Sequence, residues 1–298
     1  KKEIMKRLPN YSLLWVSFIV FLCTGCNPVS QLSVSSPDGN LCLHVETENG
    51  KIYYELSRNG KPILDKSRLG FILKEDTLAG HLEITEALHH SFSGTWEQIW
   101  GEDRIVENNY HEMTIRVQKT STPKRKFNVV FRLFNDGFGF RYEFPEQEAL
   151  KDFVIMDELT EFALTGDHKA WSIPYEAHFY EALYEASPVS KLGWVSTPLT
   201  METNDGLFLS IHEANLTDYA AMNLIPKEGS MTLKANLTPW STGEKVFMKA
   251  PGVTPWRTMI VAESAGDLLL SRLMLNLNEP CRILSNNCII FACRRAIK

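Results

Sequence analysis

The sequence predicts an all-β fold, a large two-sheet β-sandwich that takes up most of its 298 residues. Residues 127–144 alternate apolar and polar side chains on both sides of Asn135-Asp136-Gly137, which is the strongest hairpin signal in the chain. Residues 41–57 repeat this pattern around Glu48-Asn49-Gly50. A long amphipathic helix is missing, and only the short stretch 264–271 has a helical pattern.

In chain order, each strand is predicted by alternation or by a short apolar run between turn residues. The hairpin at 41–57 comes first, and at 111–118 Met113, Ile115 and Val117 share one face. In the 127–144 hairpin, four apolar residues line one face before the turn and four aromatic residues line one face after it. The other predicted strands are 69–73, 82–88, 207–213, 231–235, 258–262 and 273–277.

The stretch 157–200 lacks a regular period and is rich in aromatic residues and carboxylates. We predict a long loop there, because long loops on a β-sandwich often carry function. Its centre holds Glu181 between aromatic residues, a composition typical of sugar sites, in which carboxylates bind hydroxyl groups or calcium. A half-exposed loop glutamate with a local hydrogen bond is the alternative.

The N-terminus predicts a signal peptide with a lipobox over residues 1–26. Lys6 and Arg7 precede an apolar run at 13–23 that is too short to span a bilayer. Small residues then lead into Cys26, which we expect to be acylated. The expected location is the periplasm or the outer membrane, with a lipid anchor as the sole membrane contact. An ordinary signal peptide is the alternative.

Charge and short motifs exclude several classes of protein. Lys and Arg number 31 against 36 Asp and Glu, so the net charge is −5, and we expect no nucleic-acid partner. No P-loop, G-x-S-x-G or H-E-x-x-H motif occurs, and no C-x-x-C pair indicates zinc.

Two further segments contain chemically capable side chains. Trp96 and Trp100 stand close together with amides nearby, either as a sugar platform or as a packed pair in the core, which we favour. His212, Glu213 and Asp218 match no metal-ligand spacing, so a strand end with a hydrogen-bonded histidine is the favoured interpretation.

Several segments occur together in one order along about residues 31–281. They are Ser36-Pro37-Asp38-Gly39-Asn40, 96–102, 135–144, Trp171-Ser172-Ile173-Pro174, 211–219, Thr254-Pro255-Trp256-Arg257-Thr258 and 275–281. This ordered set resembles the N-terminal domain of glycoside hydrolase family 97, which contains α-glucosidases and α-galactosidases, often from gut Bacteroidetes. The resemblance implies a β-super-sandwich of the galactose-mutarotase type.

The resemblance also implies what this domain does and lacks. In the family a catalytic (β/α)₈ barrel follows, whereas here the likeness ends at Cys281 and the tail 282–298 reads as truncated or frameshifted. We therefore expect residues 27–281 to form the domain, with no catalytic residues of its own. A family glutamate that binds calcium together with the barrel corresponds to Glu181, with Glu176 and Glu213 next in line. One carboxylate cannot hold calcium alone, so binding should require the barrel.

The resulting interpretation is the N-terminal domain of a calcium-dependent glycosidase for α-linked oligosaccharides, inactive without its barrel. Because the barrel would carry the residues that discriminate substrates, glucoside and galactoside both stay open. A stand-alone carbohydrate-binding module at the cell surface is the alternative from another class, and a non-functional pseudogene product is a third.

Overall fold

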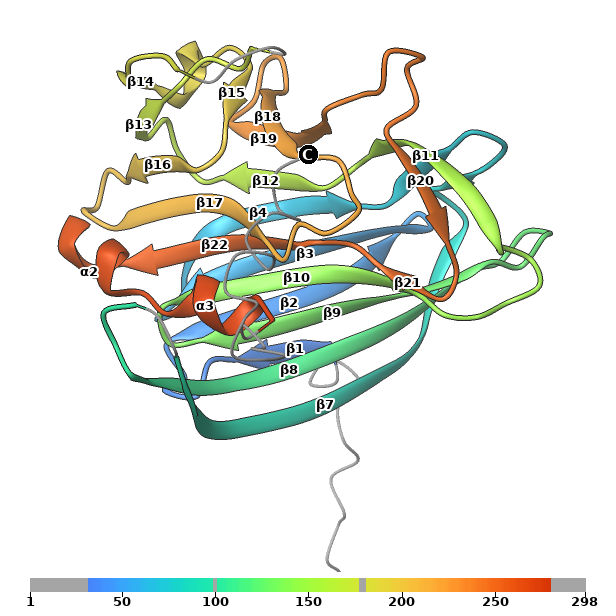
Figure 1. Cartoon of the computed structure of the whole chain (residues 1–298), viewed down its shortest axis with the longest axis horizontal. Coiled ribbons are helices and arrows are strands. Elements are labelled where there is room, and N and C mark those ends of the chain that lie inside the picture. The colour runs from blue at the N-terminus through green and yellow to red at the C-terminus, as the bar shows by residue number, and fades with distance from the viewer. Residues whose placement is uncertain (1–31, 99–100, 177–180, 280–298) are drawn as a thin grey trace, which may run out of the picture.

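The structure is a computed structural model that describes residues 32–98, 101–176 and 181–279 (Figure 1). Among these residues strands dominate and the helices are short. The strands are β1 (Ser33–Ser35), β2 (Leu41–Glu48), β3 (Lys51–Arg58), β4 (Lys61–Leu69), β5 (Phe71–Leu73), β6 (Thr77–Leu78), β7 (Leu82–Glu97), β8 (Ile105–Lys119), β9 (Lys126–Phe134), β10 (Gly137–Phe144), β11 (Asp152–Glu158), β12 (Glu161–Leu164), β13 (Lys169–Ser172), β14 (Glu185–Pro188), β15 (Val195–Ser196), β16 (Leu199–Glu202), β17 (Phe208–Ala214), β18 (Met222–Pro226), β19 (Thr232–Leu237), β20 (Val246–Lys249), β21 (Gly252–Val253) and β22 (Trp256–Ala262). The helices are η1 (Val189–Lys191), α2 (Ala265–Leu270) and α3 (Leu273–Leu277).

Two large antiparallel sheets form the predicted sandwich, and a smaller sheet is added to it. The eight-stranded sheet runs β1-β2-β3-β4-β12-β19-β18-β15, and the ten-stranded sheet runs β14-β13-β16-β17-β22-β10-β9-β8-β7, with β21 paired to β10. A third, four-stranded sheet runs β20-β11-β5-β6. Figure 1 shows β2 and β3 behind β9 and β10, so the two large sheets lie face to face there.

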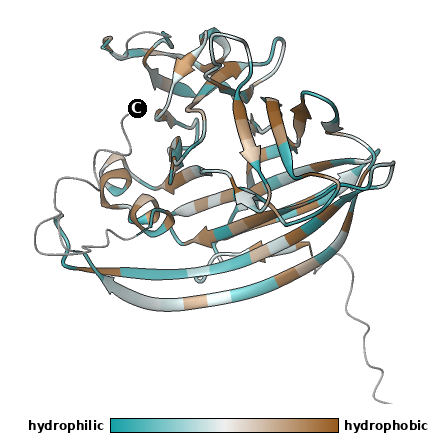
Figure 2. Cartoon of the chain, turned by 45° about the vertical axis from the view of Figure 1, so that its right-hand side comes forward, coloured by the Kyte–Doolittle hydropathy of each residue, from teal (hydrophilic) through white to brown (hydrophobic). Residues whose placement is uncertain are grey.

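The β9–β10 hairpin supplies the centre of the core, as its alternation predicts. Phe127, Phe131, Phe138 and Phe140 are all fully buried. Tyr54 of β3 reaches them from the opposite sheet, with its ring centroid 5.2 Å from that of Phe140. Apolar and polar residues alternate along the long strands (Figure 2), so one face of each strand is removed from water.

Both predicted hairpins are confirmed, and each has a glycine where its turn demands one. Asn49 and Gly50 both have positive φ, the conformation of a two-residue type I′ turn. Gly137 starts β10 at φ 150°, and a Cβ there would lie 2.3 Å from the backbone oxygen of Met259. The tight approach of β22 to β10 therefore requires glycine at this position.

The predicted strand at 273–277 is wrong, because these residues form helix α3. Leu273 and Leu277 are its buried residues and lie four positions apart, which places them on one helical face. They pack with Val130, Phe134 and Trp256 on the outer face of the ten-stranded sheet. The predicted helix at 264–271 is confirmed as α2, with Ser264 as its N-cap.

The prediction of one long loop over 157–200 is also wrong in its extent. The strands β12, β13, β14, β15 and β16 all lie within this stretch or at its end. Each has two to four residues, which is too short for alternation to be recognised in the sequence. Among the described residues, the part without strands is reduced to the connection between β13 and β14 and the short links beyond it.

Trp96 does not lie in the sandwich core as the favoured interpretation required. It is partly exposed near the end of the edge strand β7, and its Nε1 donates a hydrogen bond to Asn276 Oδ1 in α3 (2.9 Å). Trp100 lies outside the described residues. The segment therefore helps to hold α3 on the ten-stranded sheet.

Candidate functional site

The segment between β13 and β14 carries the two leading candidates for a metal ligand. Glu176 and Glu181 are both exposed on it, and β13 and β14 lie in the upper part of Figure 1. The segment is fixed where it leaves β13, since Pro174 forms a β-bridge with Val195 and Tyr175 N donates to Trp194 O (2.9 Å). Residues 177–180 lie outside the described part of the chain.

The residues that follow Glu181 are exposed although they are apolar. Leu183 is 88% and Tyr184 is 59% exposed, and Trp194 on the neighbouring segment is 52% exposed. Large apolar side chains at such exposure indicate a surface made for contact with something else. Glu181 is thus carried on an exposed segment with large apolar side chains close to it in the chain.

Glu213, the third candidate, lies in a different environment. Its carboxylate accepts a hydrogen bond from Arg257 Nη1 (2.6 Å) and another from Met222 N (3.0 Å). Burial raises the pKa of Glu213 above its usual value, although the nearby Arg257 opposes this shift. Both oxygens are engaged inside the protein, so Glu213 is the weakest of the three candidates for a calcium ligand.

Glu213 belongs to a buried ionic cluster centred on Arg257. The guanidinium also binds Glu158 with Nε to Oε1 (2.8 Å) and Nη2 to Oε2 (2.7 Å), a two-pronged contact. Thr160 and Tyr219 donate further hydrogen bonds to Glu158. Burial alone would raise the pKa of Glu158, but Arg257 and these donors lower it below the usual value.

The cluster is structural rather than catalytic. Its two carboxylates are buried and held by one guanidinium, so neither is available to protonate or attack a substrate. The sequence analysis named Arg257 only within a segment of the family resemblance and missed Glu158. A buried charge shows no periodicity of its own, and only the fold brings β11, β17 and β22 together.

His212 and Asp218 do not join Glu213 in a metal site. His212 lies near the end of β17, as expected, and its Nδ1 has no hydrogen-bond partner among the described residues. Asp218 is exposed on the connection from β17 to β18. Within the described ranges no group of three or more His, Cys, Asp or Glu residues is arranged to hold a metal ion.

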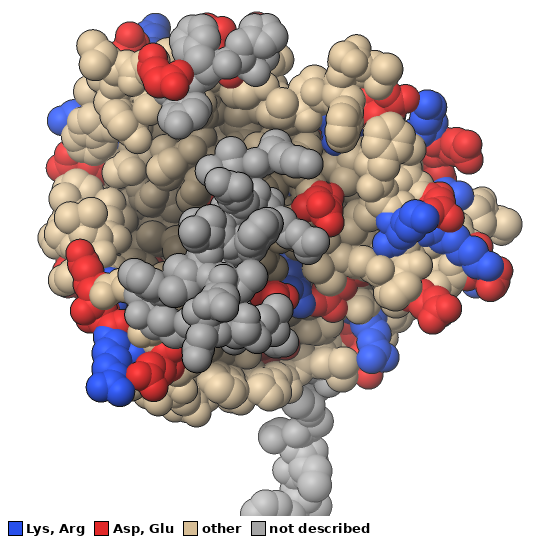
Figure 3. Space-filling model, in the orientation of Figure 1, with Lys and Arg blue, Asp and Glu red and all other residues tan. Residues whose placement is uncertain are grey.

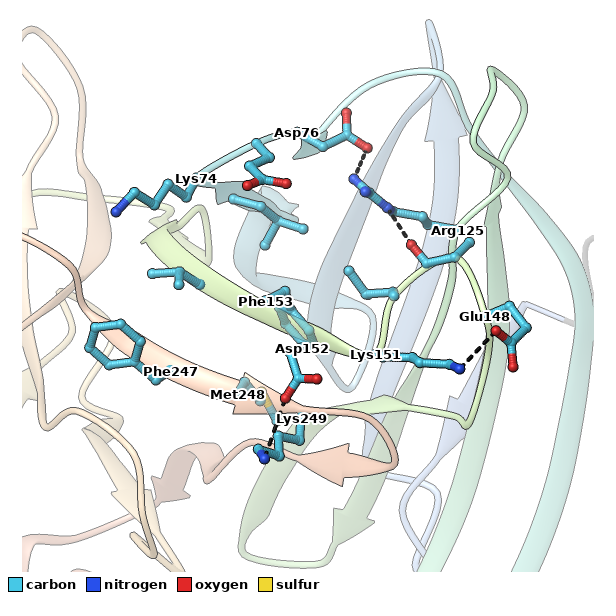
Figure 4. Close-up of a pocket in the computed structure, with 15 residues that line it drawn as sticks. Lys74, Asp76, Arg125, Glu148, Lys151, Asp152, Phe153, Phe247, Met248 and Lys249 are labelled. Atoms are coloured by element: carbon cyan, nitrogen blue, oxygen red, sulfur yellow. Dashed lines mark hydrogen bonds and ion pairs between the residues drawn. The ribbon is translucent and has the colours of Figure 1, made fainter.

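A charged groove of about 670 Å³ lies between β5–β6 and β11–β20 (Figure 4). Its charges pair with one another across short distances. Arg125 binds Asp76 and the carbonyl of Ala149. Lys151 binds Glu148 (2.8 Å), and Lys249 lies 3.5 Å from Asp152. This pairing stabilises the groove walls and leaves no cluster of one sign for an ionic ligand.

The molecular surface in Figure 3 likewise shows no large region with charges of one sign on the visible face. Positive and negative side chains are interspersed around the face that it shows. No broad basic stripe of the kind that tracks a phosphate backbone is visible on that face. The longest described helix has six residues, so nothing in the described chain is a helix of membrane-spanning length.

Comparisons with known proteins fit this all-β domain. The family model described as Glycosyl-hydrolase 97 N-terminal matches residues 34–280. The chain therefore belongs to this family as its N-terminal domain, which confirms the resemblance in the sequence.

Relatives of known activity are much longer than this chain. A retaining alpha-galactosidase of Bacteroides thetaiotaomicron is 25% identical over 88% of the chain and 43% of its own length. A probable retaining alpha-galactosidase of Streptomyces bingchenggensis is 26% identical over 78% of the chain and 35% of its own length. The chain thus spans less than half of the curated relatives it matches.

A solved structure shows the same fold. A glycoside hydrolase family 97 enzyme from Pseudoalteromonas sp. strain K8, in complex with acarbose, superposes with a TM-score of 0.82 at 37% identity. The match covers 85% of this chain and 39% of that enzyme. A variant of that enzyme in complex with panose matches equally well.

Proposed function

We propose that this chain is the N-terminal domain of a calcium-dependent glycosidase that acts on α-glucosides or α-galactosides, and that it does not hydrolyse them alone. The family match over residues 34–280 carries this proposal. Relatives are named alpha-galactosidases or bind acarbose or panose, and the chain corresponds to about two fifths of their length. The resemblance to the family places the catalytic carboxyl groups in the barrel, so we expect this domain to carry none of its own.

Glu181 is the proposed contribution of this domain to the active site. Calcium takes six to eight oxygen ligands, and the described residues contain no cluster that supplies them. A carboxylate on an exposed segment fits one such ligand, completed by residues of a catalytic barrel. Glu176 lies on the same segment and is the second candidate, whereas Glu213 is bound to Arg257.

In the complete enzyme, two carboxyl groups of the barrel would cleave the glycosidic bond. Bound calcium would supply electrostatic stabilisation of the substrate oxygen. The part played by this chain is to hold the Glu181 carboxylate in place and to shield the site with the exposed apolar residues around it. Leu183 and Tyr184 are the residues we expect the barrel to cover.

The role of Glu181 is tested by fusing a family barrel in frame after Cys281 and changing Glu181→Gln. The amide keeps the size of the side chain but removes a charge that calcium favours. The rate at limiting calcium should fall about 10- to 100-fold and recover partly with excess calcium. Glu185→Gln, an exposed carboxylate on β14, is the matched control and should leave the calcium titration unchanged. Superimposable titrations of parent and Glu181→Gln would assign the ligand elsewhere, with Glu176 next.

Inactivity of the chain alone has its own measurement. The purified protein should remain at background on aryl α-glucoside and aryl α-galactoside with calcium present. Turnover that survives repurification and disappears in Glu181→Gln would contradict the proposal. A clean intergenic gap downstream of this reading frame, in place of a barrel sequence, would favour the carbohydrate-binding module.

We further propose that Cys26 carries a lipid that anchors the protein in the periplasm or at the outer membrane. The basic residues, the short apolar run and the small residues before Cys26 support this. Expression in a bacterial host should place the parent in the membrane fraction and Cys26→Ser in the soluble fraction. Equal fractionation of the two, with no lipid adduct by mass spectrometry, would rule the anchor out.

A further inference from the structure

An aromatic groove lies on the described surface at the side of the sandwich that carries β20. Its volume is about 680 Å³, within the range of small-ligand sites. Two large rings stand exposed in it: Trp240 is 62% and Phe247 is 60% exposed, with ring centroids 6.3 Å apart in an edge-to-face arrangement. We call this the aromatic groove. It is lined by Leu216, Asp218, Tyr219, Ala220, Ala221, Thr238, Pro239, Trp240, Ser241, Lys245, Val246 and Phe247.

The wall that carries Trp240 is held in a fixed turn. Trp240 N donates to Glu244 O (2.8 Å), and Gly243 N donates to Trp240 O (2.9 Å). The Glu244 side chain in turn binds Lys74 Nζ (2.8 Å) from beyond β5. The indole is thus presented to solvent from a closed loop and loses little further freedom when a ligand binds.

The opposite wall is the connection from β17 to β18, and the buried ionic cluster holds it. Tyr219 OH donates to Glu158 Oε2 (3.1 Å), and Met222 N donates to Glu213 Oε1 (3.0 Å). Both carboxylates are bound to Arg257. These hydrogen bonds from Tyr219 and Met222 to the buried cluster hold the connection from β17 to β18 in place.

Polar groups stand beside the two rings. Asp218, Thr238 and Ser241 line the groove, and Asp218 and Ser241 are exposed. Tyr175 OH donates to Thr238 Oγ1 (3.3 Å), and the Tyr175 ring lies 5.9 Å from Trp194. The groove therefore adjoins the segment that leads to Glu176 and Glu181.

We propose that the aromatic groove binds a pyranose unit of an α-linked oligosaccharide. A pyranose has an apolar face of C–H groups that stacks on an exposed ring, and hydroxyl groups at its edge that bond to carboxylate and hydroxyl side chains. The indole of Trp240 supplies the stacking face, and Asp218, Thr238 and Ser241 supply the polar contacts. The proposal rests on the proposed carbohydrate function, which it extends to a second site beside the Glu181 segment.

The test measures binding of maltotriose and, separately, raffinose to the purified chain by titration calorimetry or ligand-observed NMR. Trp240→Ala should weaken binding of the preferred sugar at least about tenfold, because the stacking face is lost. Asp218→Asn should weaken it by a smaller factor. Phe92→Ala, an exposed aromatic residue on β7, is the matched control and should bind like the parent.

Two binding results would overturn the proposal. They are no saturable binding of either sugar by the parent, and equal binding by Trp240→Ala, whose folded state is checked by thermal unfolding. Burial of Trp240 by the barrel is the competing explanation for its exposure here. Acrylamide quenching of tryptophan fluorescence in the parent and in Trp240→Ala measures how accessible the Trp240 indole is. If Trp240 is accessible in the chain alone but not in the barrel fusion, the barrel covers it, and this result would also overturn the proposal.

Failure of this test leaves the proposed function open to its own test. The calcium titration of Glu181→Gln reports on the active site and does not require sugar in the aromatic groove. If Glu181→Gln lowers the rate at limiting calcium as expected but no sugar binds at Trp240, only the proposal for the aromatic groove is rejected. Sugar binding at Trp240 without any calcium response would reject only the role of Glu181.

Discussion

Arg257 and Glu158 form a two-pronged ion pair in complete burial. Their side chains are 0% exposed, and the contacts are 2.7 and 2.8 Å long. Glu213 binds the remaining arm of the same guanidinium at 2.6 Å. Because two buried carboxylates share one cation, the hydrogen bonds from Thr160, Tyr219 and Met222 are needed to compensate the second negative charge.

We therefore expect Arg257→Met to be strongly destabilising. The variant leaves Glu158 and Glu213 buried without a cation, and breaking a buried pair in this way costs about 3–5 kcal/mol. The free energy of unfolding should be measured by urea denaturation near pH 7. Arg257→Met combined with Glu158→Gln should recover part of the loss.

The matched control is Arg104→Met, which removes an exposed pair with Glu97. The two side chains are 80% and 59% exposed, and exposed pairs contribute about 0–1 kcal/mol. A loss at Arg257 no larger than that at Arg104 would show that the buried cluster does not stabilise the fold.

Gly137→Ala should also destabilise the protein, for a steric reason. A Cβ at this position would lie 2.3 Å from the backbone oxygen of Met259, which cannot move without disturbing the pairing of β10 with β22. We expect a loss of about 2 kcal/mol or more in urea denaturation. Gly193→Ala has open space around its Cβ and should change stability by less than about 1 kcal/mol. Equal effects of the two changes would contradict the steric explanation.

His168 should make the fold sensitive to mild acid. It is 4% exposed, and neither ring nitrogen has a hydrogen-bond partner among the described residues. Burial lowers the pKa of His168, and the nearby Asp205 and Asp167 only partly oppose this. Because the folded protein binds this proton less readily than the unfolded chain does, protonation of His168 favours unfolding. The stability is therefore complete above about pH 6.5, the ordinary histidine pKa, and is lost as the pH falls from there through the folded pKa.

The measurement compares urea denaturation at pH 7.5 and pH 5.5. The free energy of unfolding of the parent should be lower at pH 5.5 than at pH 7.5. The uptake of one proton by one histidine can lower it by at most about 1.4 kcal/mol per pH unit. His168→Gln should reduce this fall, whereas His90→Gln, an exposed residue on β7, should leave it as in the parent. His212, whose pKa burial also lowers, should account for part of the remainder. An unchanged pH dependence in His168→Gln would contradict this role.

The sequence predicted the fold where long strands meet sharp turns. The 127–144 hairpin was recognisable because side chains alternate over eight to nine residues on each side of Asn135-Asp136-Gly137. In the third sheet only β5 falls within a predicted strand, 69–73, whereas β11 was not recognised, and β6 and β20, with two and four residues, are too short a window for any period. The same limitation turned the strands within 157–200 into one predicted loop.

The candidate site was predicted only in part. The exposed segment with Glu176 and Glu181 was recognisable by its composition, and the family match agrees with the resemblance that selected it. Arg257 and Glu158 stand 99 positions apart, so no local pattern connects them. Trp240 was overlooked although Pro239, Ser241 and Gly243 mark a turn around it, and a tryptophan in a turn is poorly placed to enter the core.

The last prediction concerns helix α3, which the sequence mistook for a strand. Apolar residues at 273, 275 and 277 alternate as in a strand, but 273 and 277 also fit one helical face, and five residues cannot separate the two patterns. In the structure Leu273 is fully buried against the outer face of the ten-stranded sheet. Leu273→Ala should therefore cost about 2–4 kcal/mol in urea denaturation through lost burial and the cavity left behind.

Leu269→Ala in the adjacent helix α2 is the matched control. Leu269 is 82% exposed, so the same change of side chain should alter stability by no more than about 0.5 kcal/mol. If residues 273–277 paired as a surface strand, the two substitutions would have similar small effects. A large loss at Leu273 alone would instead confirm that α3 seals a second apolar cluster, in which Leu273 and Leu277, one helical turn apart, pack against Val130 and Trp256.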